Sequence, residues 1–188
     1  MSKSTDRPVS GTASGSAAIV QLGNPQLRQP SSAIATPTSV WVQALIDQLL
    51  TTVQAENGVG IAAPQVGENV CLIIVASRPN LRYPDAPKMR PTPMLNPQLL
   101  SHSTEIVKGW EGCLSVPGIR GWVPRYRAVE IAYQDRRGEP QRQVLRDFVA
   151  RIFQHELDHL DGRVFLDRVE STLDLISEAE YQKRVLVG

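Results

Sequence analysis

Two stretches of the chain carry hydrophobic residues at the spacing of an amphipathic α-helix. The first opens at Pro37, because proline suits the first turn of a helix, and it ends at the Asn57-Gly58 pair. Its predicted apolar face consists of Val40, Ala44, Leu45, Leu49 and Val53. We therefore expect a helix in the first third of the chain.

The second stretch precedes Gly162, a residue that tolerates the left-handed conformation at the end of a helix. One stripe, at spacings of four, three and four residues, consists of Phe148, Ile152, His155 and His159. Further apolar surface beside this stripe is expected from Leu145, Val149, Phe153, Leu157 and Leu160. The pattern predicts a helix that presents both histidines on one partly apolar face.

Between these helices the pattern changes to short apolar runs that indicate strands. The run VCLIIVA at residues 70–76 is far shorter than the roughly 20 residues that cross a bilayer, so it predicts a buried strand. Further strands are expected near residues 94–100 and 128–134, the second followed by a DRRG turn at 135–138. The proline-rich residues 78–93 are expected to run over the surface.

This order of elements predicts an α+β fold, in which antiparallel or mixed β-sheets pack around a central α-helix that bears the HExxH motif of residues 155–159. Residues 1–18 are rich in Ser, Thr, Gly and Ala and are expected to form a disordered extension. Residues 19–188 are expected to form a single catalytic domain.

The composition narrows the classes of partner. With 20 Lys and Arg against 19 Asp and Glu, the net charge of +1 provides no basic field for a nucleic acid. The two cysteines, without a recognisable secretory leader, favour a reducing compartment and free thiols over a disulfide scaffold. We therefore expect neither a nucleic-acid site nor a membrane contact.

The stretch FQHELDHLDG at residues 153–162 suggests metal chemistry. Two helical histidines four residues apart can reach one metal ion, and the glutamate after the first can act as a general base. A catalytic metal needs a third protein ligand. The histidine that one metalloprotease pattern would supply is missing, because Phe165 occupies its position. The residues considered in its place are His102, Cys113, Glu170, Glu178 and Glu180.

These candidates correspond to different kinds of protein. A zincin-like metallo-endopeptidase would use one of the three glutamates and would leave the EGCLS stretch around Cys113 without a role. A structural zinc module would close the site with Cys71 or His102 and would leave Glu156 idle. Cys71 lies in a predicted strand, where a free cysteine is usually a small buried apolar residue. His102 lies in a polar loop, where an exposed histidine needs no role.

Three motifs resemble, in order and spacing, the signature motifs of peptide deformylases: GVGIAAPQ at residues 58–65, EGCLS at 111–115 and QHELDHLDG at 154–162. LGNPQLR near the N-terminus is similar to the opening segment of that family. The resemblance implies removal of the formyl group from the N-terminal formylmethionine of new polypeptides. It also implies a metal ion held by Cys113, His155 and His159.

The resemblance further implies ferrous iron in the cell, and a thiolate ligand suits such a softer transition metal. Zinc, nickel or cobalt could occupy the same ligands. The fourth tetrahedral position is left for water, which the metal converts to the hydroxide that attacks the formyl carbon. We expect Glu156 to take the water's proton and to deliver it to the leaving amine. The expected donors to the oxyanion are the amide of Gln65 and the backbone N–H of Leu114, which the family also uses.

On the substrate side, contacts are expected from Gly58, Val59, Gly60, Ile61, Glu111 and Ile152. The two glycines suit a backbone that passes close to a substrate, whereas Val59 and Ile61 either bind the substrate backbone or pack. Phe148 is expected to join Val59 and Ile152 around the methionine side chain.

The surroundings of the EGCLS stretch leave several roles open. Arg120 or Arg125 is expected to pair with Glu111 and so to hold Cys113 in place. Asp158 and Asp161 lie either on the helix surface or behind the ligands. The expected partners are N-formylmethionyl nascent peptides and, transiently, the ribosome. The expected location is the bacterial cytoplasm rather than the stroma or matrix of an organelle.

Overall fold

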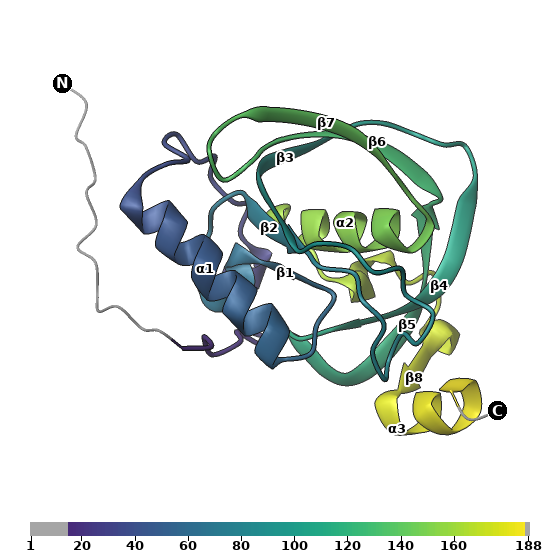
Figure 1. Cartoon of the computed structure of the whole chain (residues 1–188). Coiled ribbons are helices and arrows are strands. Elements are labelled where there is room, and N and C mark those ends of the chain that lie inside the picture. Colours follow the sequence, from purple (N-terminus) through teal and green to yellow (C-terminus); the bar gives the residue numbers. More distant parts are fainter. Residues whose placement is uncertain (1–14, 187–188) are drawn as a thin grey trace.

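The computed structural model describes residues 15–186, in which several helices and two antiparallel sheets are arranged as in Figure 1. Residues 1–14 of the predicted disordered extension lie outside the described residues. Within residues 15–18, the backbone N–H of Ala17 donates to Thr52 Oγ1 at 3.0 Å. The division of the chain into an extension and one domain stays a prediction.

The first predicted helix is α1, Val40–Ala55. Ser39 caps it, because its side chain accepts a hydrogen bond from the N–H of Val42. The face that α1 buries consists of Val42, Leu45, Ile46, Leu49, Thr52 and Val53. The predicted face was wrong at Val40, which is 81% exposed, and at Ala44, which is also exposed. Val40 is the first residue of the helix, so its side chain projects beyond the contact with the sheet.

The larger sheet has five antiparallel strands in the order β1-β2-β3-β6-β7. Their bounds are Gly60–Ala62, Leu72–Val75, Thr92–His102, Ala128–Gln134 and Pro140–Arg146. Strand β2 reads as a continuous apolar run because it is covered on both faces. Leu72 and Ile74 pack on the α1 side, whereas Ile73 and Val75 pack on the side of the second helix. The alternation continues in β1, where Ile61 faces α1 and Ala62 faces the other way.

The smaller sheet has three antiparallel strands in the order β4-β5-β8. Their bounds are Ile106–Cys113, Val116–Tyr126 and Leu175–Ser177. The EGCLS stretch lies where β4 turns into β5, so Cys113 ends one strand just before the next begins. Strand β1 is an edge strand of the larger sheet, and β4 is an edge strand of the smaller sheet.

The second predicted helix is α2, Asp147–Leu160. It contacts strands of both sheets and lies beneath the arch of β3, β6 and β7 (Figure 1). Leu145 was expected on this helix, but it lies in β7 opposite Val129. The chain leaves the strand only at Asp147, whose φ of +50° marks the change of direction. The helix ends before Gly162, whose φ of +72° suits glycine.

Short helices complete the fold. The 3₁₀ helices are Pro25–Arg28, Ala63–Val66, Phe165–Arg168 and Thr172–Asp174. Helix α3, Glu178–Tyr181, follows β8 and continues into a π-helical turn, Gln182–Leu186. Among the described residues, no helix combines the length and the apolar character that crossing a bilayer requires.

Candidate functional site

Three potential metal ligands meet between β4 and α2. Cys113 comes from the end of β4, and His155 and His159 come from successive turns of α2. Their donor atoms all lie within 4.8 Å of one another, and Cys113 Sγ is 3.3 Å from His159 Nε2. At most 9% of each residue is exposed. Within residues 15–186, no other group of His, Cys, Asp and Glu gathers its donor atoms in this way.

The other residues considered as ligands lie outside this group, namely Cys71, His102, Glu170, Glu178 and Glu180. Each of the three glutamates instead forms an ion pair with a lysine or an arginine. His102 stacks on Tyr126 with 3.6 Å between the ring centroids. The third donor is therefore the cysteine of the EGCLS stretch.

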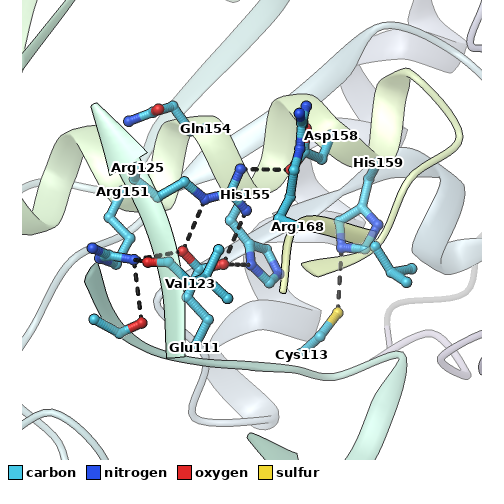
Figure 2. A network of polar contacts seen from close by, with 12 residues as sticks. Glu111, Cys113, Val123, Arg125, Arg151, Gln154, His155, Asp158, His159 and Arg168 are labelled. Carbon is cyan, nitrogen blue, oxygen red and sulfur yellow. Dashed lines mark hydrogen bonds and ion pairs between the residues drawn. The ribbon is translucent and has the colours of Figure 1, made fainter. Parts of the chain in front are cut away.

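Glu111 orients one of the histidines. Its Oε2 lies 2.9 Å from Nδ1 of His155, which leaves Nε2 of the ring for a ligand bond. Arg125 donates to both carboxylate oxygens, at 2.9 and 3.0 Å, and Arg151 donates to Oε1 at 2.9 Å (Figure 2). Burial would raise the pKa of Glu111, but the charge of Arg125 and the hydrogen bond to His155 lower it strongly. Its carboxylate is hydrogen-bonded to these three side chains, and the expected contact of Glu111 with a substrate stays a prediction.

The network extends from Arg125 to the far side of α2. Arg125 Nη1 donates to Asp158 at 2.6 Å, and Arg168 donates to the same carboxylate at 2.6 Å (Figure 2). Asp158 is 4% exposed, so it lies behind the ligands rather than on the helix surface. Of the two arginines considered as partners of Glu111, Arg125 has this role, and Arg120 binds Glu178 instead.

The electrostatics of the three donors suit a cation. Burial alone would raise the pKa of the Cys113 thiol, but the charge and hydrogen bonds of His159 and His155 lower it to about 5. A buried thiolate with two imidazoles forms a donor set that fits a borderline or soft transition metal. The group Cys113, His155 and His159 is therefore able to bind a metal ion.

Glu156 lies beside the donors but is not one of them. It is 4% exposed, and its Oε2 is a buried oxygen without a hydrogen-bond partner among the described residues. Burial raises the pKa of Glu156 to about 7. A Cβ added to Gly60 would collide with this carboxylate and would lie 2.8 Å from Cγ2 of Ile152. Glycine at position 60 therefore makes the room that Glu156 needs.

Gln65 is held with its amide nitrogen toward Cys113. Its Oε1 accepts a hydrogen bond from the N–H of Ala62 at 2.9 Å. Its Nε2 donates to Ser115 Oγ at 3.1 Å and lies 3.4 Å from Cys113 Sγ. The carbonyl oxygen is thus occupied by the backbone, and the NH₂ group is directed to the site. Gln65 is 2% exposed, so its orientation is fixed by its surroundings.

A cleft opens above these residues, between the edge strands β1 and β4. Its atom-free space is about 560 Å³, a figure that includes some open solvent. Residues expected on the substrate side that line the cleft are Gly58, Val59, Gly60, Glu111, Phe148 and Ile152, and the expected oxyanion donor Leu114 lines it too. Ile61 does not, because strand alternation directs its side chain into the core beside α1.

Four residues that line the cleft were not predicted from the sequence. Arg82 and Tyr83 line the cleft, together with Trp110 and Arg151. Arg82 and Tyr83 belong to the proline-rich segment that was expected to run over the surface. A periodic pattern does not mark such residues, since an irregular segment has no repeating face. The only signal in the sequence was an aromatic residue and an arginine set among turn residues.

Comparison with known proteins shows a consistent set of relatives. A family model described as "Polypeptide deformylase" matches residues 16–174. "Peptide deformylase 2" of Nostoc sp. (strain PCC 7120) is 62% identical over 167 residues, which cover 89% of this chain and 93% of the relative.

Solved structures agree with these sequences. A class I type b peptide deformylase from Acinetobacter baumannii, bound to Met-Ala-Ser, has a TM-score of 0.80 and 44% identity, covering 82% of this chain and 98% of that one. A peptide deformylase from Synechococcus elongatus, in complex with actinonin, has a TM-score of 0.76 and 34% identity. The match covers 92% of this chain and 89% of the S. elongatus chain.

Proposed function

Because the chain belongs to the polypeptide deformylase family and so removes the N-formyl group from nascent peptides, we propose that Cys113, His155 and His159 hold its catalytic metal ion. The observation that carries this proposal is the meeting of a thiol and two imidazoles within 4.8 Å of one another. When bound, such an ion acts as a Lewis acid and lowers the pKa of water. We propose Fe²⁺ as the native ion, with Zn²⁺, Ni²⁺ or Co²⁺ as substitutes, since thiolate and imidazole suit all four.

Glu156 is proposed as the group that moves protons. Its free Oε2 is buried beside the ligands, where a carboxylate has few other roles. Glu156 takes a proton from the water that attacks the formyl carbon. It then gives this proton to the amine nitrogen as the C–N bond breaks, so that formate and a free amino terminus leave.

Gln65 and the backbone N–H of Leu114 are proposed to stabilise the oxyanion of the attacked formyl group. The support for Gln65 is its fixed amide, which Ala62 holds with the NH₂ group toward Cys113. Leu114 follows Cys113 directly and lines the same cleft. Donors that are fixed before the reaction stabilise the developing charge without a cost of reorganisation.

The peptide is proposed to bind as an extended strand in the cleft between β1 and β4. Both are edge strands, and an edge offers backbone groups to an added chain. The side chains of Val59, Phe148 and Ile152 line the cleft and are proposed to surround the methionine. The A. baumannii relative was solved bound to Met-Ala-Ser, which supports a peptide as the ligand. In this proposal α2 is the central catalytic helix, because it carries His155, Glu156 and His159 and contacts strands of both sheets.

The decisive test is formate release from formyl-Met-Ala-Ser, with acetyl-Met-Ala-Ser as the matched substrate. We expect rapid release of formate and, because an acetyl methyl would clash in the space near Gly60 and Gln65, at least ~100-fold slower reaction of the acetyl peptide. Mass spectrometry of the products should show intact internal peptide bonds. Cleavage of internal bonds without formate would favour the endopeptidase instead.

The role of Glu156 is tested by Glu156→Gln. This variant is expected to retain the metal and to lose turnover by roughly 100-fold or more, the usual contribution of general acid–base catalysis. Turnover close to that of the parent would remove Glu156 from the mechanism. The native ion is tested by metal analysis after purification without oxygen, followed by refilling of the stripped protein with each of the four ions. Zinc as the only ion bound and active would overturn the assignment of iron.

We propose the bacterial cytoplasm as the location, because the named relatives are bacterial and cyanobacterial proteins. A transient contact with the ribosome would bring the cleft to newly made chains. Co-sedimentation of the protein with translating ribosomes tests this contact.

A further inference from the structure

The last described segment of the chain, residues 175–186, lies beyond the part that the family model matches. It nevertheless packs on the fold. Strand β8 pairs with β5, where Ile176 lies opposite Arg120, and α3 then crosses the end of that sheet (Figure 1). This segment is therefore held on the fold, although the family model does not match it.

Arg120 of β5 binds two residues of this segment, Glu178 and Tyr181. It is only 1% exposed, although it carries a permanent charge. Its Nε and Nη2 donate to the two carboxylate oxygens of Glu178 at 2.6 and 3.1 Å, and its guanidinium lies 4.4 Å from the centre of the Tyr181 ring. A buried guanidinium needs such partners, because an unpaired charge inside a protein is costly. Both partners come from the C-terminal segment.

The same guanidinium reaches the wall of the cleft. Nη1 of Arg120 donates to the hydroxyl of Tyr83 at 3.0 Å, and the Tyr83 ring lies 5.2 Å below the charge. Tyr83 lines the cleft, and its ring is 4.9 Å from that of Phe148, another wall residue. Tyr181 adds a second link, since its hydroxyl donates to the backbone oxygen of Arg82 at 3.5 Å.

We propose that residues 175–186 form a C-terminal latch that sets the position of Tyr83, so that Glu178 and Tyr181 are positioning residues for substrate binding. Tyr83 belongs to the irregular segment between β2 and β3, which has no strand or helix to fix it. Its hydroxyl and its ring are held by Arg120, and Arg120 is held by Glu178. The inference rests on the proposed function of the cleft as the peptide site.

The test compares two glutamates of α3. Glu178→Ala removes the partner of Arg120, whereas Glu180→Ala removes an exposed carboxylate whose ion pair among the described residues is with Lys183. We expect Glu178→Ala to raise KM for formyl-Met-Ala-Ser by roughly 5- to 10-fold with kcat within about 2-fold, the signature of lost uniform binding. Metal content should be unchanged. Glu180→Ala should match the parent in all three quantities.

A double variant tests whether the effect passes through Arg120. Tyr83→Phe removes the hydroxyl that Arg120 holds and keeps the ring. If both changes act through the same guanidinium, Glu178→Ala combined with Tyr83→Phe should raise KM by less than the product of the single effects. A full product would overturn the latch. Glu178→Gln removes the charge but keeps an acceptor for Arg120, and it provides the milder variant if Glu178→Ala lowers the yield of folded protein.

Hydrogen exchange gives a readout that does not depend on activity. Backbone amides of residues 80–86 should exchange faster in Glu178→Ala than in the parent, and those in Glu180→Ala should not. Equal exchange in the two variants, or equal KM, would overturn the proposal. If the parent itself released no formate, the proposed function would fail, and the exchange rates would still decide whether the latch holds Tyr83.

Discussion

Replacement of Gly60 by alanine would test how closely β1 and α2 approach each other at the site. The added Cβ would lie 2.8 Å from Cγ2 of Ile152 and 3.0 Å from Cδ of Glu156. Ordinary contacts between carbon atoms are about 3.5–4.0 Å, so these atoms must separate by roughly 0.5–1 Å. Both neighbours belong to α2, four residues apart, and Oε1 of the Glu156 carboxylate is the atom nearest to the added Cβ.

Displacement of a catalytic group by ~1 Å costs about 100-fold in rate. We therefore expect Gly60→Ala to lower kcat by about 10- to 100-fold, which corresponds to roughly 1.4–2.7 kcal/mol in the activation free energy. Metal content should be retained, because neither histidine is among the three atoms nearest to the added methyl. Gly15→Ala provides the control, since a Cβ at Gly15 would meet no atom within 4 Å.

The assay is formate release, measured with metal analysis on the same samples. The double variant Gly60→Ala with Glu156→Gln shows whether Gly60→Ala slows the reaction by displacing the Glu156 carboxylate. Two changes that act through one carboxylate are not additive. The double variant should be about as slow as Glu156→Gln alone. A Gly60→Ala enzyme with kcat within ~2-fold of the parent would refute this reasoning, as would a loss of activity that follows a loss of metal.

Three further predictions concern the ligand set, the latch and the core. Cys113→Ala should lose most of the bound metal, whereas Cys71→Ala should keep it, and equal retention would exclude the thiol as a ligand. Burial raises the pKa of Glu178, but the hydrogen bond and the charge of Arg120 help to bring it below the ordinary value of 4.5. The ion pair therefore stabilises the fold above pH 4.5 and is lost as the pH falls through the lowered pKa. Urea titrations should then show a stability difference between parent and Glu178→Gln at pH 6 that shrinks toward pH 3, and a constant difference would contradict the shift. Leu49→Ala, at a fully buried position of α1, should lower the free energy of unfolding by about 2–5 kcal/mol at unchanged metal content.

Local chemistry explains why so much of the site could be predicted. The HExxH spacing determines by helix geometry that His155 and His159 share a face and that Glu156 lies beside them. A strand that is apolar at every position indicates burial on both faces, which β2 has. Such features depend on residues within one or two turns of each other. The family resemblance then implied Cys113 as the third ligand, and the structure places its Sγ within 4.8 Å of the ring nitrogens of the two histidines.

Polar or irregular elements were harder to predict. Strand β7 is mostly exposed and polar, so its sequence gives little period-two signal, and its Leu145 was assigned to the following helix. Strands β4 and β5 contain glycines and prolines that interrupt the alternation of apolar and polar residues, so their sequences resemble that of a loop. Their strand conformation comes from pairing with each other over most of their length.

The sequence by itself indicated the candidate chemistry of this protein, namely a thiol and two histidines as potential metal ligands, a glutamate beside them, and the helix that carries the last three. Only the tertiary structure decided which charges meet. Arg120 and Arg125 looked equivalent as partners of Glu111, and they diverge because the first lies opposite β8 and the second lies between Glu111 and Asp158. An ion pair depends on distances between residues far apart in the chain, here 14, 33 and 58 positions. Spacing along the sequence does not contain those distances, because they are set by how the sheets and α2 pack.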